Sequence, residues 1–146
     1  MIDPDVRSAT PDDAAQLAWL EAEARAGLID QRGGARWLAT HLVRGDDWVA
    51  TVSADAVFVA HIGDVAVGYL VLITTGPIAV VDEVYVTPRA RELGFGDELL
   101  AAAIDRARAA GCELLEGASL PGDRDTKNLY ERAGIKARLI TVSTPL

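Results

Sequence analysis

Hydrophobic residues follow two different periods along the chain, and the change between them separates helical from extended segments. Residues 6–9 predict a short strand, and Thr10 followed by Pro11 then predicts a helix start, with the helix continuing to about Gly27. A second helix is predicted over residues 35–43. The spacing of three residues in the first helix predicts one buried face: Leu17, Leu20 and Ala24.

From Ala56 onward the period shortens to that of β-strands. Residues 56–73 form two β-rich runs around Gly63-Asp64, which favours a tight hairpin turn because both residue types accept a positive φ. Residues 78–86 predict a third strand that is apolar on both faces except for two acidic residues. A strand of this kind is usually central in its sheet.

A long helix is predicted from Gly94 to Gly111, followed by a strand over residues 112–120, a helix over 125–133 and a last strand over 135–143. Four apolar residues of the long helix recur at i, i+3, i+4 and i+7, which predicts one face packed on a sheet: Leu100, Ala103, Ile104 and Ala107. The order β-α-α-β-β-β-α-β-α-β predicts an α/β protein with a mixed sheet and helices on its faces.

Composition narrows the class of protein. A chain of 146 residues, half of them hydrophobic, suits a single domain over residues 1–146. It contains no run long enough for a membrane span, and its start lacks the features of a secretion signal, so we expect a cytoplasmic protein without membrane contact. The single cysteine fits a reducing compartment, and the net charge of −8 argues against nucleic acid as a partner.

The loop before the long helix has the composition of an anion site. Gly94 and Gly96 leave the first helical N–H groups open to a ligand, and Arg89 and Arg91 stand just before them. These features predict a phosphate cradle. The alternative is an ordinary strand-to-helix loop with two solvated arginines.

Two segments resemble the GNAT N-acetyltransferase superfamily. The first matches its acetyl-CoA signature V-x-P-x-x-R-x-x-G-x-G, and the second, 129-LYERAGI-135, is similar to its L-Y-E-x-x-G-F segment. The residues of the first segment are Val86, Pro88, Arg91, Gly94 and Gly96. The resemblance covers most of residues 6–142 and implies a GNAT-like acyl-CoA N-acyltransferase fold, with a central, mostly antiparallel sheet flanked by about four helices.

The resemblance also implies a co-substrate and a reaction. Acetyl-CoA would donate an acetyl group to a primary amine of a small molecule or peptide, which attacks the thioester directly. The pantetheine arm would pair with the strand end at Val84, Tyr85 and Val86, and the pyrophosphate would lie on the following loop. The loop residues so implied are Arg91, Glu92, Leu93, Gly94, Phe95, Gly96 and Asp97.

The same resemblance points to Tyr130 as the proton donor for the departing thiolate; the alternative is a packing residue with a hydrogen-bonded hydroxyl. Three carboxylates are candidates for the base, namely Asp82, Glu83 and Glu116, and a water relay that needs none of them stays open. Strand alternation predicts that the side chains of Asp82 and Glu83 point to opposite faces. Each of the three is equally well explained as a strand-end acid in a salt bridge or in solvent.

The chain departs from the family pattern in its loops and at its end. Glu92 stands where glycine is common, and Asp123 lies near the place of an asparagine that contacts the cofactor arm. Only one terminal strand is predicted where many members have two, which leaves open a strand contributed differently or shared across a homodimer. A non-catalytic acyl-CoA-binding regulatory module and a small interaction domain are the alternative functions.

The other conspicuous side chains predict packing or solvent exposure. His41 is expected to be partly buried and His61 to lie at the surface, and neither has a partner at metal-ligand spacing, so no metal site is predicted. Cys112 is expected to be a small core residue. Core packing is also the default for the three tryptophans, Trp19, Trp37 and Trp48.

Overall fold

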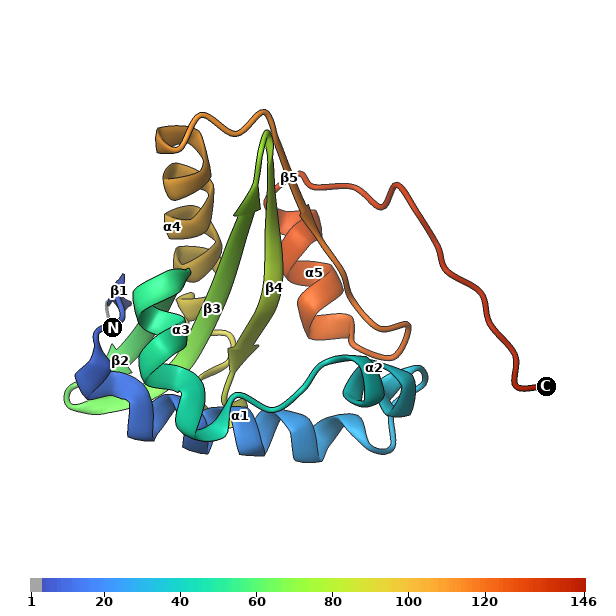
Figure 1. Ribbon diagram of the computed structural model, residues 1–146, viewed down its shortest axis with the longest axis horizontal. Coiled ribbons are helices and arrows are strands. Elements are labelled where there is room, and N and C mark those ends of the chain that lie inside the picture. The colour runs from blue at the N-terminus through green and yellow to red at the C-terminus, as the bar shows by residue number, and fades with distance from the viewer. Residues whose placement is uncertain (1–3) are drawn as a thin grey trace.

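The protein folds around one five-stranded sheet in the order β1-β2-β3-β4-β5 (Figure 1). The computed structural model describes residues 4–146. The strands are β1 (Asp5–Ser8), β2 (Ala56–Ile62), β3 (Val65–Thr75), β4 (Ile78–Val86) and β5 (Leu114–Gly117). The helices are α1 (Ala14–Leu28), α2 (Gly34–Thr40), α3 (Trp48–Ala54), α4 (Phe95–Ala109) and α5 (Arg124–Arg132). Neighbouring strands are antiparallel except β4 and β5, which run parallel and are joined through α4.

Local signals explain the starts of the main elements. The amide of Thr10 donates to the Asp13 carboxylate at 2.8 Å, which stabilises the turn that leads into α1. Gly63 has a φ of 58° and forms the turn between β2 and β3, as its sequence predicts. The predicted strand at residues 78–86 is confirmed with the same bounds as β4.

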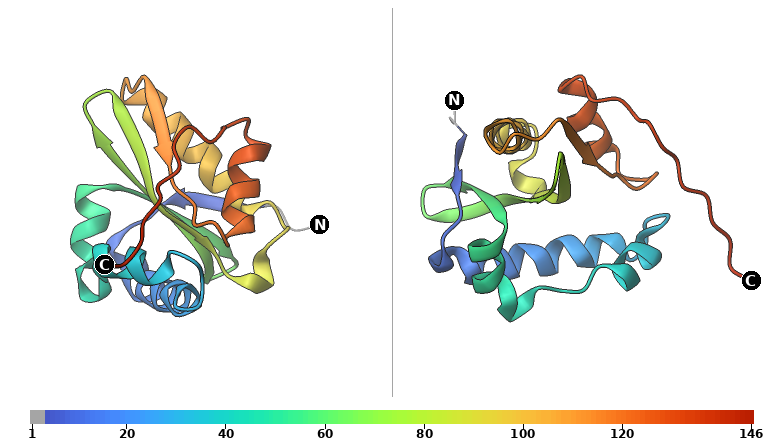
Figure 2. Two further views of the ribbon diagram at one scale, coloured as in Figure 1. Left: turned by 90° about the vertical axis from the view of Figure 1, so that its right-hand side faces the viewer. Right: turned by 45° about the horizontal axis from the view of Figure 1, so that its top comes forward.

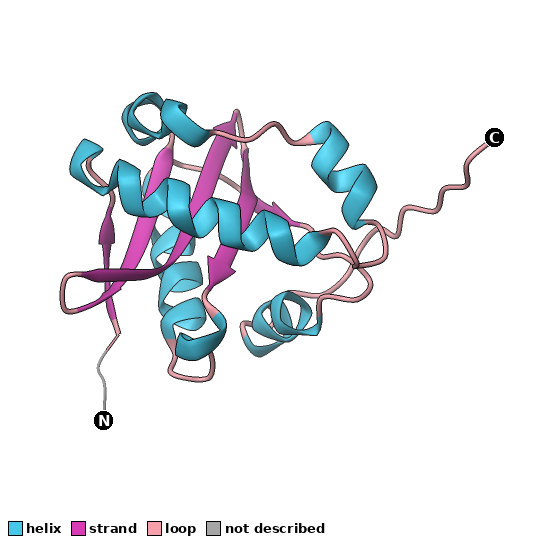
Figure 3. Ribbon diagram, turned by 90° about the horizontal axis from the view of Figure 1, so that it is seen from below, coloured by secondary structure: helices cyan, strands magenta, loops and turns pink. Residues whose placement is uncertain are grey.

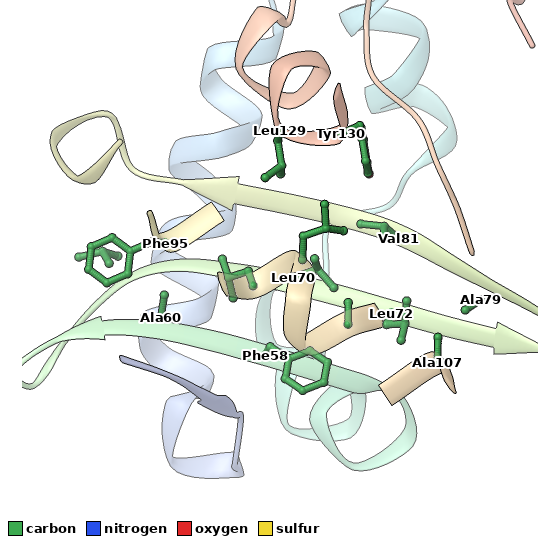
Figure 4. Close-up of a cluster of buried hydrophobic side chains, with 14 of the residues drawn as sticks. Phe58, Ala60, Leu70, Leu72, Ala79, Val81, Phe95, Ala107, Leu129 and Tyr130 are labelled. Carbon is green, nitrogen blue, oxygen red and sulfur yellow. The ribbon is translucent and has the colours of Figure 1, made fainter. Parts of the chain in front are cut away.

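Helices cover both faces of the sheet, and each face has its own apolar core. On one face α1 and α3 pack on β2 and β3, with Leu17, Leu20 and Trp48 at the centre; Figure 3 shows α1 lying across the strands. On the other face α4 and α5 cover the sheet, and Figure 4 shows Leu129 and Tyr130 pointing from α5 toward β4. The buried face of α4 contains Leu100, Ala103 and Ala107, as the helical spacing predicts.

The parallel pair β4 and β5 separates halfway along β4. Pairing begins at Ile78 opposite Leu114 and ends at Val81 opposite Gly117, while β4 continues to Val86. The second half of β4 therefore has no strand on its β5 side. No strand of residues 4–146 pairs with the backbone there, and its Val86 carbonyl accepts a hydrogen bond from the Arg91 side chain.

The last predicted strand is wrong. Residues 135–143 form no strand, and Leu139, Ile140 and Val142 are more than four-fifths exposed. The amide of Ile135 donates to the Tyr130 carbonyl at 2.9 Å, and the segment then leads away from the sheet (Figures 1 and 2). A strand needs a ladder partner, and β-rich composition alone does not provide one.

Three smaller expectations are also corrected. The sequence predicted two helices before β2, but a third helix, α3, is also present. Its two turns contain a single apolar pair that packs on the core, Trp48 and Val52, and one pair is too short a pattern to predict a helix. Trp19 is 68% exposed rather than part of the core. His61 is buried instead of lying at the surface, with its Nε2 3.7 Å from the Asp13 carboxylate.

Candidate active site

A cleft of about 440 Å³ opens where β4 and β5 separate. It is lined by the end of β4, the loop before α4, the first turn of α4 and one face of α5. Every residue that the sequence implied for cofactor binding lines it except Leu93, which is 40% exposed beside it. The α5 side adds six residues, of which only Asp123 was expected near the cofactor: Asp123, Asp125, Thr126, Asn128, Leu129 and Arg132.

The first turn of α4 presents free backbone donors to this cleft. Gly94 precedes the helix with a φ of 90°, and the first helical hydrogen bond runs from the Glu98 amide to the Gly94 carbonyl at 3.1 Å. The amides before Glu98 lie in the turn that has no intrahelical acceptors. A Cβ placed on Gly96 would meet Leu129 at 3.5 Å, an ordinary contact, so packing within the chain does not require glycine there.

Charged side chains in the cleft are paired with each other. Arg91 donates from Nε to the Val86 carbonyl at 2.9 Å and from Nη1 to Asp125 at 2.9 Å. Arg132 forms a second pair with Asp97, also at 2.9 Å. Four carboxylates and two guanidinium groups line the cleft, so a polyanion that binds these arginines must displace Asp125 or Asp97.

Glu92 is the residue of the loop that fits its backbone least well. Its φ is 65°, a left-handed value that costs a side-chain-bearing residue about 1–2 kcal/mol. Glycine adopts this conformation without that cost. Glu92 also brings a carboxylate to the lining of the cleft.

Tyr130 lies at the edge of the cleft without lining it. Its hydroxyl is buried beside Gly117, where a Cβ would come within 2.2 Å of Oη, and it has no hydrogen-bond partner among residues 4–146. Burial, and secondarily the charge of Asp123, raises the pKa of Tyr130 to about 12, so the hydroxyl is protonated at neutral pH. A buried hydroxyl without a partner is unusual, and it is located where β5 ends and the cleft begins.

The acids of β4 lie together on the opposite face of the sheet, which corrects the sequence prediction that they point apart. Val71 pairs with Glu83 and Leu72 with Val81, so Asp82 is the extra residue of a β-bulge. The bulge interrupts the alternation of side chains. Arg44 consequently binds both acids, Asp82 at 2.6 Å through Nη2 and Glu83 through Nη1.

Glu83 and Glu116 differ in their surroundings. The Glu83 side chain is 8% exposed, and burial raises its pKa to about 7 in spite of the opposing effect of Arg44. Glu116 is exposed on β5 opposite Val80. Of the three carboxylates named from sequence, Glu83 has the least exposed side chain.

The family is shown by the sequence itself. Residues 13–135 match the model of the acetyltransferase (GNAT) family. The chain belongs to this family. No curated protein matches the sequence.

Solved structures share the fold at low identity. The BH1408 protein from Bacillus halodurans superposes with a TM-score of 0.80 at 21% identity, covering 100% of both chains. An aminoglycoside N-acetyltransferase, AAC(6')-Iy, bound to a bisubstrate analogue gives 0.72 at 18% identity over 99% of this chain and 100% of its own. A ribosomal-protein-alanine N-acetyltransferase from Brucella melitensis biovar Abortus 2308 gives 0.72 at 19% identity, with the same coverage.

Among residues 4–146, no helix has the length and apolar character that crossing a membrane requires. The same residues contain no group of three or more histidine, cysteine, aspartate or glutamate side chains arranged to hold a metal ion.

Proposed function

We propose that this protein is an N-acetyltransferase that transfers an acetyl group from acetyl-CoA to a primary amine of a small molecule or peptide, within a single domain spanning residues 1–146. The observation that carries the proposal is the cleft between the diverging halves of β4 and β5, closed at one end by the first turn of α4. Family membership supports acetyl transfer, and the cleft supports a thioester donor with an extended arm.

The residues of the cleft fit this donor. Val84, Tyr85 and Val86 offer strand backbone without a β5 partner, which suits the amide groups of a pantetheine arm. The turn from Arg91 to Gly96, together with Asp97, offers amide donors and the positive end of a helix dipole to a pyrophosphate. Gly96 supports this assignment. The packing of the chain would tolerate a Cβ at this position, so the approach of a ligand is the reason we give for glycine there.

The chemistry is assigned to groups on either side of the sheet. A primary ammonium must lose one proton before its nitrogen can form the C–N bond, and we assign Glu83, whose pKa is raised to about 7, to accept it. As the C–S bond breaks, the Tyr130 hydroxyl donates its proton to the departing thiolate. The nitrogen loses its second proton when the amide forms, and that proton replaces the one given up by Tyr130. The amide of Val86 or a neighbour stabilises the carbonyl oxygen during attack. Asp82 and Glu116 are the remaining candidates for the base.

Calorimetry with acetyl-CoA tests the cradle. Gly96→Ala should weaken binding about tenfold or more, because the methyl group faces the ligand, while the unfolding free energy stays the same or rises by up to about 1 kcal/mol. Exposed Ala101, elsewhere on α4, provides the control Ala101→Ser, which should leave binding unchanged. Unaltered binding in Gly96→Ala would remove the pyrophosphate from this turn.

Release of free CoA with a panel of amines tests the chemistry. Tyr130→Phe should lower kcat by about a hundredfold with little change in acetyl-CoA binding. Gly117→Ala should also slow turnover. This variant keeps Tyr130, but the added methyl group would push the phenol out of its position. A near-normal rate in Tyr130→Phe would exclude the assigned role, and binding without CoA release for any amine would identify an acyl-CoA-binding module instead.

We also propose that the protein is a homodimer. The exposed segment 136–143 is rich in β-branched residues and carries Lys136 and Arg138, whereas the open edge strand β5 carries Glu116 and follows Glu113. These charges favour pairing of the segment with β5 of a second copy. Light scattering should give twice the chain mass for the parent and the monomer mass for a chain ending at Ile135. A monomeric parent would contradict the proposal.

A further inference from the structure

Arg44 occupies a position that neither the motifs nor the cleft account for. Its side chain is 18% exposed, and its two terminal nitrogens bind the two consecutive carboxylates that the β4 bulge turns to one face. Asp82 and Glu83 are separated from Arg44 by 38 and 39 residues in the chain. The guanidinium also lies over the Trp48 ring, 5.3 Å from its centroid, which fixes its plane.

The backbone of Arg44 is itself held by a buried acid. Glu21 of α1 is fully buried, and its two oxygens accept hydrogen bonds from the amides of Arg44 and Gly45, both at 2.9 Å. A third bond, at 3.2 Å, comes from the Trp48 indole. A buried carboxylate is costly unless it is satisfied, and here all the donors come from the segment that carries Arg44 or directly follows it. Glu21 therefore anchors that segment to α1.

Two acids and two arginines act on Glu83, and Arg44 has the largest effect of the four. Glu21 from α1 and Asp82 from β4 disfavour its ionised form, while Arg44 and, more weakly, Arg25 favour it. The neutral Tyr69 packs near it from β3. Arg44 is the only one of these groups that bonds directly to Glu83. Without Arg44, the Glu83 carboxylate would lie near Glu21 and Asp82 and would have no bonded cation.

We propose that Arg44 is a positioning residue for acetyl transfer: it bonds to the Glu83 carboxylate, favours its ionised form against the effect of burial, and holds it one residue before the strand segment that lines the cleft, while Glu21 anchors Arg44 for this task. The inference rests on the proposed function, in which Glu83 takes the proton of the acceptor ammonium. It identifies a network of residues from α1, the loop before α3, and β4 that no motif of the sequence marks.

The direct test is a titration of Glu83 followed by carbon NMR in the unliganded protein. Arg44→Met retains the length and apolar stem of the side chain but removes the cation, so the pKa of Glu83 should rise by about one to two units. Arg36→Met removes a cation from an exposed position on α2 and should leave the titration of Glu83 in place. Arg44→Lys keeps a positive charge but cannot bond to both carboxylates with two planar N–H groups. It should raise the pKa of Glu83 less than Arg44→Met does.

The second test is the pH dependence of kcat/KM with the best amine. A base must be unprotonated to act, so activity falls as the pH drops through the pKa of Glu83, and the acidic limb should move to higher pH in Arg44→Met by the same shift that NMR records. A purely structural role would lower kcat/KM at every pH without moving the limb. Arg44→Lys, which retains a cation, keeps the test decisive if Arg44→Met does not fold.

The outcomes separate this inference from the proposed function. A Glu83 titration unchanged in both Arg44 variants overturns the inference, whether or not the parent is active. An acidic limb that stays in place while the NMR titration moves also overturns it, because Glu83 is then not the group that limits the reaction. A parent that releases no CoA with any amine refutes the proposed function, and with it the role of Arg44 in transfer, while the NMR shift still reports the coupling itself.

Discussion

The two faces of β4 use charge in different ways. On the cleft side the ion pairs Arg91–Asp125 and Arg132–Asp97 are exposed, with Asp125 68% accessible. On the opposite side Glu21 is fully buried, and Glu83 is nearly so. Exposed pairs contribute about 0–1 kcal/mol each and are easily exchanged for other partners, whereas a buried acid cannot lose its partner cheaply.

The difference matches the tasks proposed for the two faces. A pyrophosphate can replace Asp125 at Arg91 because both groups are already in contact with water and their pairing is weak. The carboxylate that accepts a proton must instead be kept in one place, which a buried network achieves. The cleft face is therefore suited to exchange of ligands and the opposite face to positioning.

The largest expected effect is on stability. Glu21→Gln should lower the free energy of unfolding by about 3 kcal/mol. The NH₂ group of glutamine would face a buried backbone N–H, so two donors would meet where one acceptor is needed. Asp97→Asn, the same kind of change in an exposed pair, should stay within about 0.5 kcal/mol. Urea unfolding of both variants measures the contrast. Equal losses would show that the two faces do not differ in this way.

The next effect concerns pH. Burial raises the pKa of Glu83 from its ordinary 4.5 to about 7, so the fold favours its protonated form. Its contribution to stability is therefore fully present below about pH 4.5 and is lost as the pH rises through 7. Relative to Glu83→Gln, the parent should lose up to about 3 kcal/mol over that range, measured by urea unfolding at each pH. Parallel pH profiles for the two proteins would contradict a raised pKa.

The smallest effect is on ligand affinity in the cleft. Asp125→Asn releases Arg91 from its carboxylate, so acetyl-CoA should bind about two- to fivefold more tightly in calorimetry at low salt. Asp105→Asn makes the same charge change on the exposed side of α4 and should have less effect. If the two variants strengthen binding equally, net charge rather than the Arg91–Asp125 pair determines the affinity.

Much of the cofactor side could be predicted from sequence because its groups are local. Arg91, Gly94 and Gly96 lie within six residues, and a turn at the start of a helix brings such neighbours together in any tertiary context. Most of the α5 half of the cleft was missed, although Asp123 was expected near the cofactor and the segment that begins at Leu129 marked α5 as part of a family motif. Asp125 and Arg132 face the cleft only because α5 packs beside the diverging strands.

The acidic side could not be predicted to the same degree. Asp82 and Glu83 were recognised as unusual in an apolar strand, but the bulge that turns both toward Arg44 depends on the register between β3 and β4. No periodicity within β4 reveals that register. Glu21 and Arg44 lie on elements whose sequences match no motif, so their roles emerge only when α1, the following loops and the sheet come together.

The sequence by itself determined the order of elements from β2 through α5, the glycine turn before α4 and the family to which the chain belongs. These properties depend on neighbours in the chain, whose spacing the sequence states directly. The tertiary structure alone decided the pairing of Arg44 with two acids, the burial of His61 and the exposed course of residues 135–143. Each of these depends on contacts, or on their absence, between segments distant in sequence, which local pattern does not encode.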